Sequence, residues 1–581
     1  MLKIWKKLKV LLDKKQKRFM ALLVFMMLIG AILEVFSVAT VIPVANIVFS
    51  PNEIHENSLL DSLYNLFGFQ SDKTFGIAVM LSLIVAFVLK NVYIYFMQKV
   101  MYHFVYTNQF RTSERMMKNY MRRGYEFYLS ADTAVIQRSI TSDVNNMYAL
   151  ILSLLQLISE TIVFVVLSVV LLITDPVMTI VIASLLGITL LAIKIILKPI
   201  MRRAGEENQE YYSNLFKWIN QTVTGIKEVK IGGKEKYFID TYCGYGKGYV
   251  DAVQRYTLYN NIPRLIIETV CVAGIVGYLL FLFLGSNETG NVLDIIAAFG
   301  VALMRLMPCA NRINNQLNSI SYFEPFFMGV SDNLQDEIDS KKVDTSIFEV
   351  RREKLPVEKE ICLTDISYKY PNTDKWILKD ANVTIPVGSA VGIVGETGSG
   401  KSTFVDVLLG LLVLQDGKIE VDGQNIFEGD NYRKWLKNVG YIPQTVFMID
   451  DTIRKNVAFG IPEDEIDEER VWEVLREAQL DEFVKSLPEG LETGIGERGI
   501  RLSGGQRQRI SIARALYEDP KVLVLDEATS ALDNDTEKAI MDSINHLHGK
   551  KTLIIIAHRL QTIEKCDAVY RIEGTKAKRE R

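Results

Sequence analysis

The first half of the chain is dominated by apolar segments that are long enough to cross a lipid bilayer. A transmembrane helix needs about 20 predominantly apolar residues, and such segments lie at about 19–49, 75–105, 147–174, 177–200, 262–284 and 290–320. The connections after the second and fourth segments are long and polar but keep a helical composition. Because long structureless loops are rare, the pattern predicts six spanning helices, some of which extend beyond the membrane.

Basic residues are distributed unevenly among the connections. They crowd the stretches at 98–123 and 198–236, whereas 50–74 contains a single lysine and 285–291 contains no basic residue. Cytoplasmic loops carry the excess of lysine and arginine in membrane proteins, so we expect the two basic connections and both chain ends to be cytoplasmic. Glycine-interrupted turns within the basic connections predict short transverse helices that press on a cytoplasmic domain.

The second half has a different pattern of apolar and polar residues. From about residue 359, short apolar strands alternate with helical segments, which is typical of an α/β domain around a parallel sheet. We predict an N-terminal interfacial helix at 1–18, a six-span domain with cytoplasmic helix extensions at 19–320, a charged linker at 321–358, and the α/β domain at 359–581.

The first 18 residues are dense in lysine and lack a small-residue cleavage site, which argues against a cleavable signal. We interpret them as an amphipathic helix whose apolar residues lie in the headgroup layer while its lysines face anionic lipid. The apolar residues are Trp5, Leu8, Leu11 and Leu12. The alternative is a solvated basic tail.

Composition narrows the function classes. With 581 residues, 49% of them hydrophobic, the chain is too long for one core and too apolar for an ordinary soluble enzyme. A net charge of -3 argues against a nucleic-acid partner, since phosphate-tracking surfaces are usually strongly basic. The five cysteines show no CxxC spacing, and we expect them to be reduced, buried and structural.

GETGSGKS, at 395–402, stands between an apolar strand and a helix and fits the pattern G-x-x-x-x-G-K-[ST]. Glycines let backbone amides approach phosphate oxygens, Lys401 reaches the β- and γ-phosphates of ATP, and the Ser402 hydroxyl binds Mg²⁺. The strand and helix on either side disfavour a glycine-rich turn without a ligand. The expected nucleotide contacts are Gly395, Glu396, Thr397, Gly398, Ser399, Gly400, Lys401, Ser402 and Thr403.

Two further strand ends carry candidate catalytic groups. VLVLDE, at 522–527, ends in Asp526, which we expect to hold Mg²⁺, and in Glu527, which we expect to polarise the water that attacks the γ-phosphate. These acids could instead be merely solvated. His558 follows the strand TLIIIA, and although a lone histidine is more often structural, its place beside the other motifs favours a γ-phosphate contact.

LSGGQ begins a basic helix and creates a second helix start suited to an anion. Its residues are Ser503, Gly504, Gly505 and Gln506. One nucleotide has little need of two such helix starts in one domain. We therefore expect LSGGQ to cap the ATP held by a second copy of the chain, so that ATP joins two domains and hydrolysis releases them.

GETGSGKS, GYIPQ, LSGGQ, VLVLDE, SALD and AHR occur in the order seen in ATP-binding-cassette (ABC) ATPases, which this half resembles. The resemblance implies that Tyr370 stacks on adenine, that Gln444 is a Mg²⁺ ligand and that Asp533 belongs to the ATP site. The whole chain resembles an exporter half-molecule that works as a homodimer. The implied fold is a membrane all-α six-helix domain fused to an α/β P-loop ATPase domain.

Lys90 lies deep in the second predicted span, Arg264 at the start of the fifth and Arg305 in the sixth. Ionisable residues inside a membrane are costly and are functional candidates, and Arg305 lies near mid-membrane. We expect these cations to meet a multiply charged anion such as a pyrophosphate. The alternative is ion pairing with acids inside the bundle, for example Arg264 with Glu268. We expect Arg312, which lies nearer the cytoplasm, to form a structural or interfacial ion pair.

An outer connection offers a candidate site for a lipid tail. NSLLDSLYNLFGF places its apolar residues on one helical face, which suggests a short helix on the outer leaflet. The tail candidates are Leu59, Leu63, Leu66 and Phe67. The alternative is a self-packed loop.

The membrane segments narrow the resemblance to bacterial flippases of lipid-linked oligosaccharides. It is carried by LMRLMPCANRI, NIPRL, AILEVFSVATVIPV and the basic Lys90. It implies ATP-driven flipping of a polyprenyl-pyrophosphate-linked oligosaccharide to the outer leaflet of the bacterial inner membrane. An exporter of a drug or of another lipid, such as lipid A, would need fewer deep cations. A non-transporting ABC ATPase is disfavoured by the six spans.

Overall fold

The computed structural model describes residues 2–39, 62, 64–69, 71–174, 176–285, 292–335, 353–371, 373–527, 538, 541–542, 544–557 and 563–581. Contacts divide the chain into two compact units. The helical unit comprises residues 1–123 and 131–344, and the α/β unit comprises 124–130 and 345–581.

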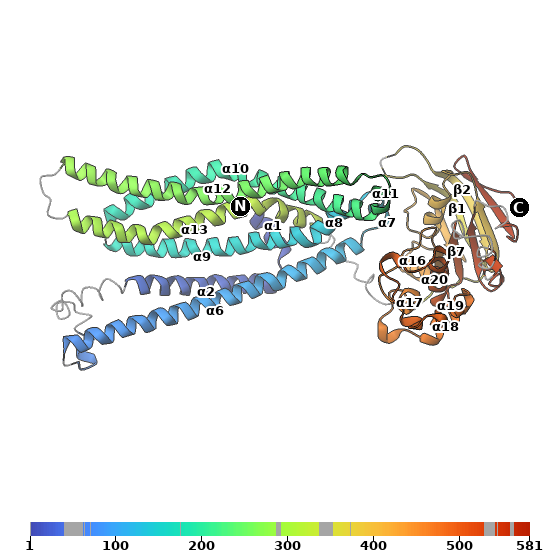
Figure 1. Ribbon diagram of the computed structural model, residues 1–581, viewed down its shortest axis with the longest axis horizontal. Helices are drawn as coiled ribbons and strands as arrows, with labels where there is room; N and C mark the ends of the chain where they lie inside the picture. Colours follow the sequence, from blue (N-terminus) through green and yellow to red (C-terminus); the bar gives the residue numbers. More distant parts are fainter. Residues whose placement is uncertain are drawn as a thin grey trace. The chain divides into compact units, whose positions relative to one another are not determined.

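Among the described residues, the helical unit contains six long helices (Figure 1): α2 (Lys14–Ala39), α6 (Asp72–Met121), α9 (Val144–Thr174), α10 (Pro176–Thr224), α12 (Glu235–Gly285) and α13 (Val292–Asn333). Within the described residues, parts of α2, α6, α9 and α10 are long and apolar enough to cross a membrane. Helix α6 has 50 residues, about 75 Å at 1.5 Å per residue, against a hydrocarbon core of about 30 Å. Helix α6 is therefore much longer than the hydrocarbon core is thick.

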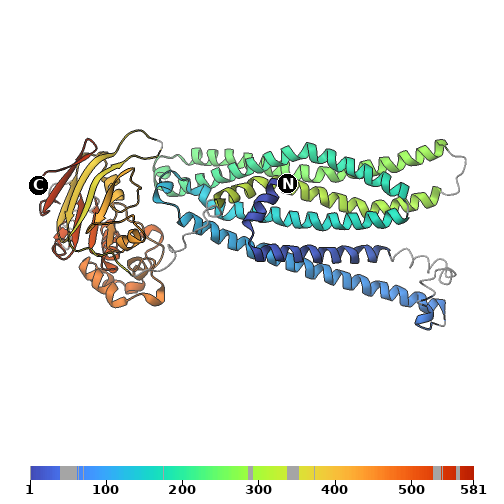
Figure 2. The same ribbon diagram turned by 180° about the vertical axis from the view of Figure 1, so that it is seen from behind.

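Four of these helices, α9, α10, α12 and α13, pack together, while α2 lies beside α6 and also contacts α9. Both views show α2 and α6 side by side (Figure 2). The shared core contains Ala31, Val163, Leu186, Ile267 and Leu306 from five different helices. Short elements complete the unit: α1 (Leu2–Leu11), α8 (Thr133–Arg138), a π-helical turn at Ser139–Asp143, and α11 (Ile226–Ile231).

The N-terminal helix α1 forms as predicted, but its apolar side does not face the headgroup layer. Ile4, Leu8, Leu11 and Leu12 are buried, and α1 packs on α13. Lys7 forms an ion pair with Asp332 of α13. The physical reason is that α13 offers an apolar surface at this point, which removes the leucines from lipid and water while Lys3, Lys6 and Lys9 stay exposed.

The α/β unit contains two sheets. The larger sheet has the order β10-β9-β3-β8-β7-β6, with β3 (Ala390–Val394), β6 (Val439–Ile442), β7 (Val522–Asp526), β8 (Thr552–Ile556), β9 (Ala568–Glu573) and β10 (Lys576–Arg579). All pairings in it are parallel except that of β9 with β10. Strands β3 and β8 are buried throughout, which explains why, apart from Thr552 at the start of β8, they contain no polar side chain.

The second sheet is antiparallel, with the order β2-β1-β4-β5. Its strands are β1 (Glu360–Tyr368), β2 (Leu378–Pro386), β4 (Asp416–Val421) and β5 (Gln424–Asn425). The unit's helices are α7 (Tyr125–Ser130), α15 (Lys401–Leu408), α16 (Asn431–Leu436), α17 (Ile453–Val457), α18 (Glu468–Glu477), α19 (Asp481–Ser486) and α20 (Gly504–Tyr517). The predicted parallel sheet is thus present, and an antiparallel sheet accompanies it.

All five cysteines are free. Cys271, Cys309 and Cys566 are buried, as expected, whereas Cys243 is exposed because it lies on a polar stretch of α12.

Candidate functional site

The loop between β3 and α15 has the geometry of a phosphate cradle. Gly400 has a φ of +104°, and a Cβ there would lie 2.8 Å from Ile377 Cγ2, so only glycine fits. Lys401 is 5% exposed, and its Nζ donates hydrogen bonds to the carbonyl oxygens of Gly395 (2.9 Å) and Glu396 (3.1 Å). The lysine thus folds back across the loop and holds its charge over the backbone.

The same loop contains a buried polar atom without a partner. Among the described residues, Ser399 Oγ is buried and makes no hydrogen bond. A buried hydroxyl without a partner is costly, and a phosphate oxygen would accept its hydrogen bond. The loop therefore fits a nucleotide phosphate chain both in its charge and in its unused donor.

Tyr370 lies next to this loop. Its hydroxyl and Thr403 Oγ1, at the start of α15, are 3.0 Å apart. A recess beside it is lined by Lys369, Tyr370, Pro371, Thr373, Asp374 and Gln415. The aromatic ring predicted to stack on adenine thus stands within reach of the phosphate loop.

The acidic groups lie at the carboxyl ends of neighbouring strands. Strands β6 and β7 pair in parallel, so the residues that follow them meet at one sheet edge. There, Gln444 Nε2 donates a hydrogen bond to Glu527 Oε2 at 2.6 Å, and Tyr441 Oη donates one to Asp526 Oδ2 at 3.2 Å. Glu527 has a φ of +47°, an uncommon backbone conformation for a residue with a side chain. The structure therefore brings Gln444, Asp526 and Glu527 together at this edge.

Burial perturbs the carboxylates near this edge. Burial raises the pKa of Asp526, and the neighbouring Glu527 charge adds to the effect. Burial raises the pKa of Asp406, on α15, to about 6, with a further contribution from the Asp526 charge. A cation placed between these groups would relieve both penalties, because it favours their charged forms.

The LSGGQ segment forms the start of α20. Ser503 caps this helix, since its Oγ accepts from Gln506 N at 3.2 Å, and Gln506 Oε1 accepts from Ser503 N at 2.8 Å. Ser503 and Gly504 are exposed. The helix start is therefore preformed and faces outward from the unit that carries it.

Several predicted site residues lie outside the described residues: Asp533, His558, Leu59 and Leu63. The outer connection is described only in part, with Leu66 and Phe67 exposed. Next to them, the rings of Tyr64 and Phe69 lie 6.2 Å apart, and each lies 5.3 Å from that of Phe75 at the start of α6, so this part of the connection packs on itself and on α6.

The predicted membrane cations differ in their surroundings. Lys90, on α6, lies over the Phe87 ring at 4.7 Å, and Arg264, on α12, is exposed. Within the described part of the chain, neither has an ion-pair partner, and the alternative pairing of Arg264 with Glu268 is not formed. The helix α13 carries Arg305, but the side chain of that residue is outside the described structure.

Arg312 behaves differently from these cations. Its Nε lies 2.7 Å from Glu160 Oε2, so an ion pair joins α13 to α9. The interpretation of Arg312 as a structural pair is confirmed.

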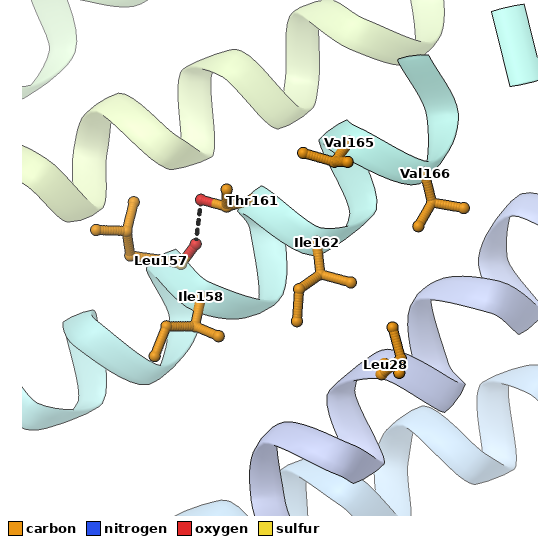
Figure 3. Close-up of a pocket in the computed structure, with 7 residues that line it drawn as sticks. All are labelled: Leu28, Leu157, Ile158, Thr161, Ile162, Val165 and Val166. Carbon is orange, nitrogen blue, oxygen red and sulfur yellow. Dashed lines mark hydrogen bonds between the residues drawn. The ribbon is translucent and has the colours of Figure 1, made fainter. Parts of the chain in front are cut away.

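Sequence reasoning missed an apolar recess between α2 and α9 (Figure 3). It is lined by Leu28 of α2 and by Leu157, Ile158, Thr161, Ile162, Val165 and Val166 of α9. The Thr161 hydroxyl donates to the Leu157 carbonyl at 2.7 Å, so the lining offers apolar atoms and almost no free polar group. The sequence does not indicate this recess, because the residues on both of its sides are apolar, as in any helix that faces lipid.

The sequence predicted a short transverse helix in the segment that holds α7, but it did not indicate which residues this helix contacts. Glu126 Oε1 accepts hydrogen bonds from Tyr368 Oη (3.0 Å) and Val413 N (3.4 Å), and contacts group α7 with the α/β unit. The Tyr368 ring in turn lies 5.3 Å from that of Tyr370. A continuous set of contacts therefore leads from α7 to the phosphate loop.

Comparisons with known proteins agree with these features. The family described as ABC transporter transmembrane region matches residues 20–299, and the one described as ABC transporter matches residues 378–530. A bacterial Atm1-family ABC exporter with ATP bound has the same fold, with a TM-score of 0.77 at 20% identity over 97% of this chain and 95% of that one.

Curated relatives are named ATP-dependent lipid A-core flippase. That of Saccharophagus degradans is 32% identical over 64% of this chain and 61% of its own length. That of Escherichia coli (strain K12) is 31% identical over 66% of this chain and 64% of its own length, and that of Idiomarina loihiensis is 39% identical over 39% and 40%. The chain thus spans less than two thirds of the length of these relatives.

Proposed function

Because this chain belongs to the ABC transporters and joins one exporter-type membrane region to one ATPase region, we propose that it uses ATP hydrolysis to move an amphipathic lipid between membrane leaflets. The observation that carries this proposal is the meeting of Gln444, Asp526 and Glu527 at one edge of a sheet whose strand β3 leads into the phosphate loop of Lys401, in a chain whose other half contains membrane-length helices.

The residues of the sheet edge have separate tasks. Lys401 and the backbone amides of residues 395–400 bind the β- and γ-phosphates. The Ser402 hydroxyl, the Gln444 amide and the Asp526 carboxylate would hold Mg²⁺, a set of oxygen ligands that suits this ion once phosphate oxygens complete it. When bound, Mg²⁺ supplies the charge that stabilises the transferring phosphoryl group. Glu527 orients and polarises the attacking water.

We further propose that two copies form two composite ATP sites. The exposed, preformed start of α20 supports this, because a helix start with outward-facing amides suits the γ-phosphate of a nucleotide held by the other copy. Hydrolysis would remove this shared ligand and release the two copies from each other.

For the cargo, the relatives favour a lipid of the lipid A type over the polyprenyl-pyrophosphate-linked oligosaccharide that the membrane motifs imply. Both lipids carry phosphate groups. Lys90 and Arg264 have no ion-pair partner among the described residues, which suits a phosphate-bearing headgroup. Together with Arg305, these residues are the proposed headgroup contacts. The bacterial inner membrane, with both chain ends cytoplasmic, is the proposed location.

Reconstituted vesicles test this proposal. We expect lipid A-core to stimulate ATP hydrolysis and to appear in the opposite leaflet, and the variant Lys90→Gln/Arg264→Gln/Arg305→Gln to lose translocation while its basal hydrolysis persists. The control Arg202→Gln/Arg203→Gln removes surface charges that are already paired with Glu206 and Glu207.

Stimulation by a polyprenyl-pyrophosphate-linked oligosaccharide instead would transfer the proposal to that cargo. If neither lipid stimulates hydrolysis or crosses the bilayer, a lipid-flipping function is refuted.

A further inference from the structure

Helices α1, α10 and α13 enclose a recess that the proposed function does not use. Its polar lining consists of Lys194 and Lys198 on α10 and of Asn318, Ser321 and Glu324 on α13, where the Ser321 hydroxyl already donates to the Leu317 carbonyl. Ile4 of α1 forms part of its apolar wall. About 30 Å³ inside it is open to groups the size of a water molecule. We call it the α1 recess.

The two lysines of the α1 recess are one helical turn apart and have no ion-pair partner among the residues that the structure describes. On the next turns of the same helix, Arg202 and Arg203 pair with Glu206 (3.0 Å) and Glu207 (2.9 Å). Helix α10 thus neutralises its basic residues elsewhere but leaves two charges at the recess.

The recess also contains an unused buried donor. Asn318 is 3% exposed, and its Nδ2 makes no hydrogen bond within the described structure. An unpaired amide donor at such burial costs free energy, so the site is incomplete without an acceptor. Two lysines against the single carboxylate of Glu324 leave the lining net positive, which favours an anionic acceptor.

The position along α10 indicates where this acceptor resides. Lys194 and Lys198 follow Pro176, the first residue of α10, by 18 and 22 residues, or about 27 and 33 Å at 1.5 Å per residue. With Pro176 at the outer surface, both lysines lie at the inner boundary of a hydrocarbon core about 30 Å thick. Phosphate groups of inner-leaflet lipids occupy this level.

We propose that the α1 recess binds a phosphate group at the inner surface of the membrane. Lys194 and Lys198 supply the charge, Asn318 Nδ2 donates a hydrogen bond, and Ile4 contacts the apolar part of a lipid. Glu324 opposes the anion and limits the affinity. The occupant does not need to be the cargo, because the site lies on different residues from the cations proposed to meet the cargo headgroup.

The experiment uses the full chain in phosphatidylcholine nanodiscs and measures binding of a spin-labelled phosphatidylglycerol. We expect Lys194→Gln/Lys198→Gln to weaken this binding by about fivefold per lysine. We expect Asn318→Leu to weaken it as well, and Glu324→Gln to strengthen it. The opposite signs distinguish a binding site from a general loss of folding, which would weaken binding in every variant.

The control Arg202→Gln/Arg203→Gln removes the same number of charges from the same helix outside the recess, and we expect little change in binding. A preference for phosphatidylglycerol that survives the double lysine variant, or that falls equally in the control, would overturn the proposal. Competition identifies the source of the phosphate. Resistance of the bound probe to a large excess of inorganic phosphate supports a lipid ligand. Displacement of the probe supports a soluble phosphate compound at the same site.

Discussion

The hydrogen bond between Glu126 and Tyr368 links α7 to the ATPase fold, and its strength can be measured with Tyr368→Phe, Glu126→Gln and the double variant. Tyr368 is fully buried, and its hydroxyl lies 3.0 Å from the Glu126 carboxylate. Burial and the Glu126 charge raise the pKa of the Tyr368 phenol, so the hydroxyl remains a donor throughout the neutral pH range. The expected partner atoms are therefore the same under all assay conditions.

The magnitude follows from the nature of the acceptor. A hydrogen bond to a charged group contributes about 1.5–3 kcal/mol, and the partial exposure of Glu126 lowers the expectation to about 1–2 kcal/mol. Val413 N, at 3.4 Å, is a long second donor and replaces little of the loss. Each single variant therefore loses most of the stabilisation that the Glu126–Tyr368 hydrogen bond provides. Adding the second substitution lowers the free energy of unfolding by little more.

The assay is a double-mutant cycle on thermal unfolding of the purified protein, repeated on lipid-stimulated ATP hydrolysis. We expect a coupling energy of about 1–2 kcal/mol between the two sites. The contacts from Tyr368 to Tyr370 and from Tyr370 to Thr403 connect α7 with the phosphate loop. Because the variants break this connection at α7 and leave the phosphate loop itself unchanged, we expect stimulation by lipid to fall more than basal hydrolysis. Additive effects in both assays would refute the reasoning. Tyr432→Phe combined with Glu126→Gln is the matched control, and this pair should be additive.

Three further substitutions test other parts of the structure. Glu527→Gln should retain ATP binding but lower steady-state phosphate release by about 100-fold or more; near-normal release would contradict its role. Arg312→Gln or Glu160→Gln should lower the unfolding temperature, and the double variant should recover part of the loss, because a single change leaves one membrane charge without its partner; equal losses in all three would argue against the pair. Asp406 has a pKa raised to about 6 by burial and by the Asp526 charge, so its contribution to stability is present below about pH 4 and is lost as the pH rises through 6. Asp406→Asn should therefore unfold at a higher temperature than the wild type at pH 8 and show a smaller difference at pH 5, and a difference independent of pH would exclude this explanation.

The sequence by itself determined the features that depend on neighbouring residues. Runs of about 20 apolar residues specify helices that can cross a membrane, whatever else surrounds them. The phosphate loop is equally local, because the glycines that the backbone needs and the lysine that crosses it stand within GETGSGKS. The relative order of the other motifs was enough to indicate the family.

Only the tertiary structure decided which distant residues meet. The amphipathic pattern of α1 predicted an apolar side, but whether lipid or α13 covers it depends on a surface more than 300 residues away, as the Lys7–Asp332 ion pair shows. Glu126 and Tyr368 are 242 positions apart, and nothing local to either marks the other. Likewise, Lys194 and Lys198 read as ordinary basic residues until α13 brings Asn318 beside them. Periodicity and spacing specify which side of an element is apolar or charged, but the free energy of packing selects what that side contacts.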